Sequence, residues 1–160
     1  MNKSIKKGVG FGLTSGIITT LGMIIGLNSS TSSKTAVIGG IVVIAIADAL
    51  SDALGIHISE ESTNVHTTKE IWEATTATFC SKFVFALIFI FPFLFFSLHL
   101  SIIICVIMGL SLIAIFSVYL AQRQKIPAYK AVFEHIFIAI VVIIAAHYVG
   151  EAVKLLTISA

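Results

Sequence analysis

Two aspartates, Asp48 and Asp52, lie inside the stretch "AIADALSDALGIH", which is otherwise typical of a membrane-spanning helix. A spacing of four residues places both carboxylates on one face of a helix, about 6 Å apart along its axis. Carboxylate oxygens suit protons and hard or borderline divalent cations such as Mg²⁺, Ca²⁺, Mn²⁺ or Fe²⁺. Ionisable residues inside a membrane span usually mark an ion or proton path. The stretch therefore predicts a cation site within a membrane.

The aspartate pair is costly to insert into hydrocarbon. Each central aspartate costs about 2.5–3.5 kcal/mol, whereas Ile, Val and Leu each return about 0.3–0.6 kcal/mol. The span holds eleven such apolar residues, so its net free energy of insertion is close to zero. The alternative is a structural pair that hydrogen-bonds to neighbouring helices. Because we expect no lysine or arginine at matching depth to neutralise the pair, we favour the ion path.

Small and hydroxylated residues continue the aspartate face toward one end of the helix. Gly55 and Ser59 lie on this face, and Ser51 borders it. The face ends beside Glu60 and Glu61, which we expect to form an acidic, metal-binding entrance. We predict that these three small residues line the path. The carboxylates of the two aspartates and the two glutamates are predicted to bind the metal.

The first apolar stretch carries small residues at alternating spacings of four and three, a pattern that favours close helix–helix packing. The members of this seam are Gly8, Gly12, Ser15, Thr19, Gly22 and Gly26. We expect the seam to face the aspartate helix. Ser15 and Thr19 lie near its middle, where their hydroxyl oxygens would assist a bound ion.

The composition predicts a polytopic, all-α membrane protein. Of the 160 residues, 58% are hydrophobic and only 11% are charged, too few for the surface of a soluble domain. The net charge of +2 is too small to suggest nucleic acid. No nucleophile–base pair, H-E-x-x-H or G-x-S-x-G motif is present, so we expect no enzyme activity.

Five apolar stretches are long enough to cross a bilayer, and together they form one domain spanning 1–160. The predicted spans are 9–27, 36–58, 78–96, 101–121 and 131–153. Eight of the ten lysines and arginines fall on one side of these spans, and only Lys34 and Lys154 on the other. This asymmetry predicts a cytoplasmic N-terminus and an external C-terminus. We expect the protein to lie in a prokaryotic plasma membrane, in contact with lipid.

The polar segment 59–77 is predicted to be a short cytoplasmic connector that contains an amphipathic helix. His66, Glu70 and Glu73 could collect metal there, although an ordinary solvated connector explains them as well. His147 and Glu151, four residues apart near the outer end of the last span, could form an exit or proton relay. A plain interfacial pair is the alternative.

Two motifs, "GVGFGLTSGIITTLGMIIGL" (8–27) and "DALSDALGIHISEES" (48–62), resemble the vacuolar iron transporter family. The segments 89–95 and 146–154 resemble its Pro-containing third span and the end of its fifth. The resemblance implies five spans, a cytoplasmic N-terminus and a homodimeric pathway that exports ferrous iron or manganese in exchange for protons. It implies a compact, prokaryotic-type member without the long cytoplasmic metal-binding domain of plant members.

The sequence departs from the family pattern at its metal ligands. Ser15 and Gly16 stand where the family has an Asp-Gly pair, and Asp52 stands where it has a methionine. The family's Glu-Tyr pair falls on Ile56 and His57. Exchanging methionine for aspartate makes the site harder, which favours manganese or another hard divalent ion. Asp48 has no counterpart in the family pattern. Its predicted role as a ligand is based only on its position in the apolar span and its spacing to Asp52.

We therefore expect a homodimeric transporter that exports a divalent metal, ferrous iron or manganese, with no permanently bound cofactor. If two subunits share the aspartate face, four carboxylates meet around one pathway. Carboxylates crowded in a low dielectric favour their protonated form, which is the chemistry of proton–metal exchange. The alternatives are a non-transporting metal sensor or assembly partner of the same fold, and a transporter for another cation.

Overall fold

The computed structural model describes residues 3–158, and all regular structure within that range is helical. The elements are α1 (Lys3–Thr31), α2 (Lys34–Val43), a π-helical turn η1 (Ile44–Asp48), α3 (Ala49–Ser62), α4 (Thr68–Ile88), α5 (Ile90–Phe95), α6 (Leu98–Gln124) and α7 (Ala128–Ile158). The segments α2–η1–α3 and α4–α5 each form one long unit. Five units are thus long and apolar enough to span a membrane, in agreement with the predicted number.

The helical units extend beyond the predicted spans, especially around the connector. Only residues 63–67 separate α3 from α4. The Thr67 hydroxyl accepts a hydrogen bond from the Glu70 backbone N–H, while the Glu70 carboxylate accepts one from the Thr67 N–H. This capping box starts α4 at Thr68. The expected short amphipathic helix is therefore the first part of α4, and not a separate element.

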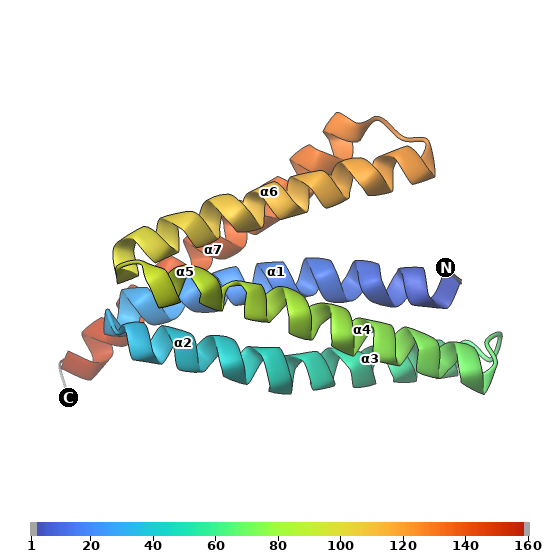
Figure 1. The fold of residues 1–160 in the computed structure, drawn as a ribbon, viewed down its shortest axis with the longest axis horizontal. Helices are drawn as coiled ribbons and strands as arrows, with labels where there is room; N and C mark the ends of the chain where they lie inside the picture. Colours follow the sequence, from blue (N-terminus) through green and yellow to red (C-terminus); the bar gives the residue numbers. More distant parts are fainter. Residues whose placement is uncertain (1–2, 159–160) are drawn as a thin grey trace.

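The helix α1 lies at the centre of the bundle (Figure 1). It packs mainly against α4 and α7, and to a lesser extent against α2 and α6. The N-terminus lies at the same end as the α3–α4 and α6–α7 loops, and the C-terminus lies at the opposite end (Figure 1). An odd number of crossings requires this placement of the two termini.

Glycines of α1 permit close approach on two sides. A Cβ atom added to Gly12 would lie 2.5 Å from the carbonyl oxygen of Thr78 in α4. Toward the other end of α1, a Cβ on Gly22 would lie 3.0 Å from Val142 in α7. The expectation that one continuous seam faces the aspartate helix is therefore wrong. The glycines of the seam are divided between α4 and α7, because a 29-residue helix crosses different neighbours along its length. Ser15 of the seam does meet the aspartate helix, through Asp52.

The break between α4 and α5 follows from Pro92, which has no N–H to donate to a backbone carbonyl. Side chains of α6 bond carbonyl groups at the break and just after it. The Ser101 hydroxyl donates to the Pro92 carbonyl oxygen at 2.9 Å, and the Cys105 thiol donates to that of Phe89 at 3.6 Å. Such compensation is needed where a helix breaks within an apolar bundle.

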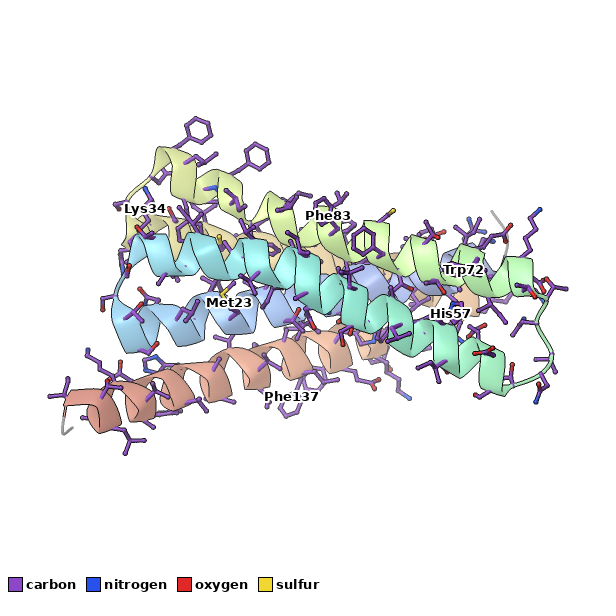
Figure 2. The ribbon with its side chains drawn as sticks, turned by 90° about the horizontal axis from the view of Figure 1, so that it is seen from below. Met23, Lys34, His57, Trp72, Phe83 and Phe137 are labelled. Atoms are coloured by element: carbon purple, nitrogen blue, oxygen red, sulfur yellow. The ribbon has the colours of Figure 1, made fainter. Side chains whose placement is uncertain are left out.

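The helix α7 is the least covered of the five units, with only 11% of its apolar window buried. Figure 2 shows Phe137 pointing away from the bundle, and its side chain is 59% exposed. Large apolar side chains on the outside are expected where the surroundings are lipid tails.

The close approach of α1 to α4 predicts that Gly12→Ala lowers the free energy of unfolding by about 1–3 kcal/mol, because the methyl group would overlap the Thr78 carbonyl. Gly39→Ala is the matched control, since a Cβ there also meets nothing within 4 Å. It should be neutral or slightly stabilising. Thermal unfolding of the purified protein in detergent measures both, and equal midpoints for the two variants would contradict the packing.

Candidate functional site

The aspartate pair meets a buried lysine in the middle of the bundle. Lys82 comes from α4, and its side chain is completely buried. Its Nζ lies 2.6 Å from Oδ2 of Asp48 and 2.5 Å from Oδ2 of Asp52. One ammonium group therefore lies between two carboxylates that the helix places one turn apart.

Ser15 of α1 joins the same cluster. Lys82 Nζ donates a hydrogen bond to Ser15 Oγ at 2.9 Å, and the Ser15 hydroxyl donates to Asp52 Oδ2 at 2.6 Å. The side chains of Ser15, Asp48, Asp52 and Lys82 thus form one network, which we call the Lys82 cluster. It joins α1, α4 and the η1–α3 segment.

Gly16 explains how α4 comes close enough to bury a lysine. A Cβ added to Gly16 would lie 3.2 Å from Cα, Cγ and the carbonyl oxygen of Lys82. The absence of a side chain at Gly16 leaves room for the first part of the lysine side chain against α1. The ammonium group then reaches Ser15, the neighbour of Gly16 in sequence.

Asp48 lies at the end of the π-helical turn and Asp52 in the first turn of α3. A π-helical turn is rare and often occurs at a functional site. The Asp48 side chain is 34% exposed and that of Asp52 is 21% exposed, so both carboxylates reach the surface of α2–η1–α3. Among the residues described, Asp48 Oδ2 has the ion pair with Lys82 but accepts no hydrogen bond.

The expectation that no lysine or arginine lies at the depth of the aspartates is wrong. Lys82 falls near the start of the predicted third span, where the sequence suggests an interfacial, cytoplasmic position. In the structure α4 begins ten residues earlier than that span, at Thr68, which places Lys82 well inside the bundle. Without Lys82, seven of the eight lysines and arginines predicted to be cytoplasmic remain, against two on the other side, so the charge asymmetry still predicts the same orientation.

The sequence contained a signal for the position of Lys82. Residues buried along α4 recur every four positions, as Ala74, Thr78, Lys82 and Ala86. Three of these are small, which places Lys82 on a face that packs closely against another helix. A lysine on such a face needs an anionic partner, and the aspartates are the acidic residues inside the apolar stretches that precede it.

The residues predicted to line a path from the aspartates lie on the outside of the chain. Ser51, Gly55 and Ser59 are exposed. Thr19 is half-buried, and its hydroxyl donates to the Ser15 carbonyl oxygen at 2.9 Å. A path along these residues would therefore run over the outer face of α3.

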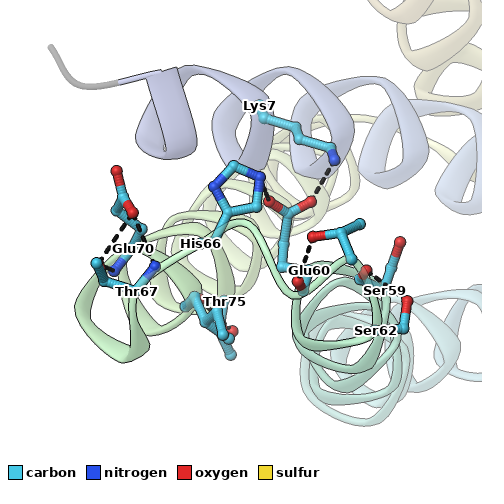
Figure 3. A network of polar contacts seen from close by, with 10 residues as sticks. Lys7, Ser59, Glu60, Ser62, His66, Thr67, Glu70 and Thr75 are labelled. Atoms are coloured by element: carbon cyan, nitrogen blue, oxygen red, sulfur yellow. Dashed lines mark hydrogen bonds and ion pairs between the residues drawn. The ribbon is translucent and has the colours of Figure 1, made fainter.

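Glu60 occupies the predicted entrance but is already paired. Its side chain is 2% exposed, and its carboxylate forms an ion pair with Lys7 of α1. The other carboxylate oxygen lies 3.3 Å from Nε2 of His66 (Figure 3). Glu61 is exposed on the surface. Glu60 thus connects the ends of α1 and α3, and of the two glutamates only Glu61 is open to solvent.

The remaining residues proposed for metal collection do not converge. Glu70 is directed to Thr67 in the capping box, and Glu73 lies 3.9 Å from Lys69 (Figure 3 shows the Glu70 contacts). The nearby His57, which is not among these residues, is also engaged: its Nδ1 lies 3.0 Å from the Thr75 hydroxyl, and Figure 2 shows its ring near Trp72. Within residues 3–158, no three His, Cys, Asp or Glu side chains are grouped so that they could hold a metal ion.

At the opposite end of the bundle, His147 Nδ1 lies 2.8 Å from the Ser29 hydroxyl, which joins α7 to α1. Glu151 is half-buried, and in the part of the chain that the structure describes no hydrogen bond connects it to His147. The histidine thus contacts a helix other than its own.

The buried ion pairs predict that Lys82→Met lowers the free energy of unfolding by about 3–5 kcal/mol, because two carboxylates lose their counter-charge. The triple variant Lys82→Met/Asp48→Asn/Asp52→Asn should recover most of this loss. Lys34→Met, at a half-buried lysine whose Nζ donates an exposed hydrogen bond to the Phe96 carbonyl oxygen, is the control and should change little. Thermal unfolding in detergent measures all three. A wild-type midpoint for Lys82→Met would show that the pairs do not stabilise the fold.

Comparison with protein-family models, curated proteins and solved structures gives no match for this chain.

Proposed function

We propose that this protein is a cation transporter of a prokaryotic plasma membrane that exports a divalent metal, ferrous iron or manganese, in exchange for protons. The observation that supports this most directly is the Lys82 cluster. Two carboxylates and one ammonium group lie together inside a bundle of apolar helices. Ionisable groups at such a depth are costly and usually serve an ion or proton path.

The charges of the cluster support exchange rather than simple binding. With all three groups ionised, two negative charges face one positive charge, so the cluster has one negative charge in excess. A divalent cation that replaces the ammonium group would meet both carboxylates and the Ser15 hydroxyl. Lys82 would then release a proton from Nζ, and the entering ion would take over its role as counter-charge.

The outer face of α2–η1–α3 supports a homodimer. Both aspartates reach one edge of this face, and Leu50 and Leu54, toward its opposite edge, are 56% and 59% exposed. Two copies joined there would bring four carboxylates and two lysines around one pathway. The second copy would also cover Ser51, Gly55 and Ser59, which a single chain leaves on its surface.

The ligands present favour hard ions over soft ones. Carboxylate and hydroxyl oxygens contact one another at the cluster, whereas no cysteine or methionine takes part in it. Such a donor set suits manganese at least as well as ferrous iron. The same ligands would also suit another cation that prefers oxygen, so such a cation is an alternative substrate.

A non-transporting role, as a metal sensor or assembly partner, is the second candidate. It is favoured by the ammonium group that already neutralises part of the site, and by the lack of a group of three metal-binding side chains among residues 3–158. In that case the Lys82 cluster would serve to hold α1, α3 and α4 together.

Transport by the purified protein in lipid vesicles tests the proposal. Wild-type protein should move manganese or ferrous iron while a pH-sensitive dye reports opposite movement of protons. Asp52→Asn and Asp48→Asn should each slow metal transport by about tenfold or more, because each removes a charged partner of the cation. Glu134→Gln, which removes an exposed carboxylate of α7 outside the Lys82 cluster and the predicted path, is the control and should transport normally.

Failure of wild-type vesicles to move either metal would exclude the transporter and favour the second candidate. Normal transport by both aspartate variants would show that the carboxylates are structural. Metal movement without proton movement would reject the exchange while leaving the cation path in place.

A further inference from the structure

A groove of about 610 Å³ lies between α1 and α6, at the end of the bundle that holds the N-terminus. Here the α6–α7 hairpin diverges from α1 (Figure 1). The Lys82 cluster involves the contacts of α1 with α4 and α3, and no residue of that cluster lines the groove. The groove is therefore a separate feature that the proposed transport does not use.

The groove combines an apolar wall with basic residues. Val9, Phe11, Phe116 and Leu120 supply apolar side chains, and a Cβ on Gly10 would lie 3.4 Å from Cζ of Phe116. The basic residues are Lys6, Lys7 and Arg123, and the lining contains no aspartate or glutamate. A cationic groove with an apolar wall fits an amphipathic anion.

Two of the three basic residues are available for such a ligand. Lys7 is engaged by Glu60, whereas Lys6 is exposed and has a flexible side chain. The Arg123 guanidinium lies 5.4 Å from the centre of the Tyr119 ring, a cation–π contact that holds it beside the groove. Its N–H groups form a planar fork that suits phosphate oxygens.

Other titratable groups near the groove do not cancel this charge. His135 lines the groove, and its Nδ1 lies 2.7 Å from the Ser117 hydroxyl. Glu134, the nearest acid in sequence, is exposed and lines the neighbouring hollow with Lys130. The groove thus keeps the positive charges of Lys6 and Arg123, which line it from α1 and α6.

We propose that this groove binds an anionic phospholipid, with the phosphate held between Lys6 and Arg123 and an acyl chain lying along Gly10 and Phe116. The distribution of lysine and arginine predicts that this end of the bundle faces the cytoplasm, where anionic lipids are concentrated. Basic pockets between membrane helices on this side are suited to such headgroups. The apolar wall favours a lipid over a free phosphate ion, which would leave that wall uncovered.

Native mass spectrometry of the purified protein tests this site, with phosphatidylglycerol and phosphatidylcholine of equal chain length added in detergent. Wild-type protein should retain phosphatidylglycerol preferentially. Lys6→Gln/Arg123→Gln should weaken its retention by roughly tenfold or more, since each basic residue near an anionic headgroup contributes to attraction. Lys7 is left unchanged because its loss would remove the lysine partner of the buried Glu60 carboxylate.

Lys125→Gln/Lys130→Gln is the matched control, because it removes two charges from the same end of the chain but neither residue lines the groove. It should retain phosphatidylglycerol like the wild type. Gly10→Leu should also weaken retention, because its side chain would fill the space beside Phe116, and leucine is favourable in a helix.

Three results would overturn the proposal. The first is equal retention of the two lipids by wild-type protein. The second is an equal loss in the control pair, which would indicate general surface attraction. The third is full retention by Gly10→Leu, which would show that the acyl chain does not lie in the groove beside Phe116.

Discussion

The ion pairs of Lys82 with Asp48 and Asp52 are the constraint on which the other features of the bundle depend. Charges removed from water are tolerated only with close, well-placed partners. The partners here come from α4 and the η1–α3 segment, and Ser15 of α1 bonds to both sides. Three helical units must therefore keep one relative placement, and a shift of any of them would leave a charge buried without its counter-charge.

Glycine provides the short distances that this placement needs. Gly8, Gly12 and Gly16 recur every four residues on the side of α1 that meets α4, and Gly16 lies directly against Lys82. On its other side, α1 meets α7, where a Cβ on Gly150 would lie 2.5 Å from the Gly26 carbonyl oxygen. The central helix thus contacts two neighbours at backbone distance. Packing and a few polar contacts then replace the hydrophobic driving force that is missing between helices in lipid.

Apolar run length was enough to predict five helical units, because a bilayer-sized stretch has few other solutions. The helix ends were not predictable in this way, since the start of α4 depends on the local capping box of Thr67 and Glu70. The aspartate pair was identifiable from its apolar surroundings, whereas Lys82 was not identified because its depth depends on where α4 begins. Likewise, the glycine pattern of α1 indicates close approach but does not specify α4 or α7 as the partner.

The composition of the Lys82 cluster has a consequence for any cation that enters it. Two carboxylates and one ammonium group leave one negative charge, which a single proton or monovalent cation can balance. A divalent cation balances the two carboxylates only when Lys82 has lost its proton, because otherwise the cluster has one positive charge in excess. Exchange of a proton for a metal would thus follow where each cluster binds its own ion, with the lysine coupling the two movements. One divalent ion shared by the two clusters of a dimer would balance both without proton release. The same lysine also stabilises the empty site, since without it the two half-buried carboxylates would repel each other.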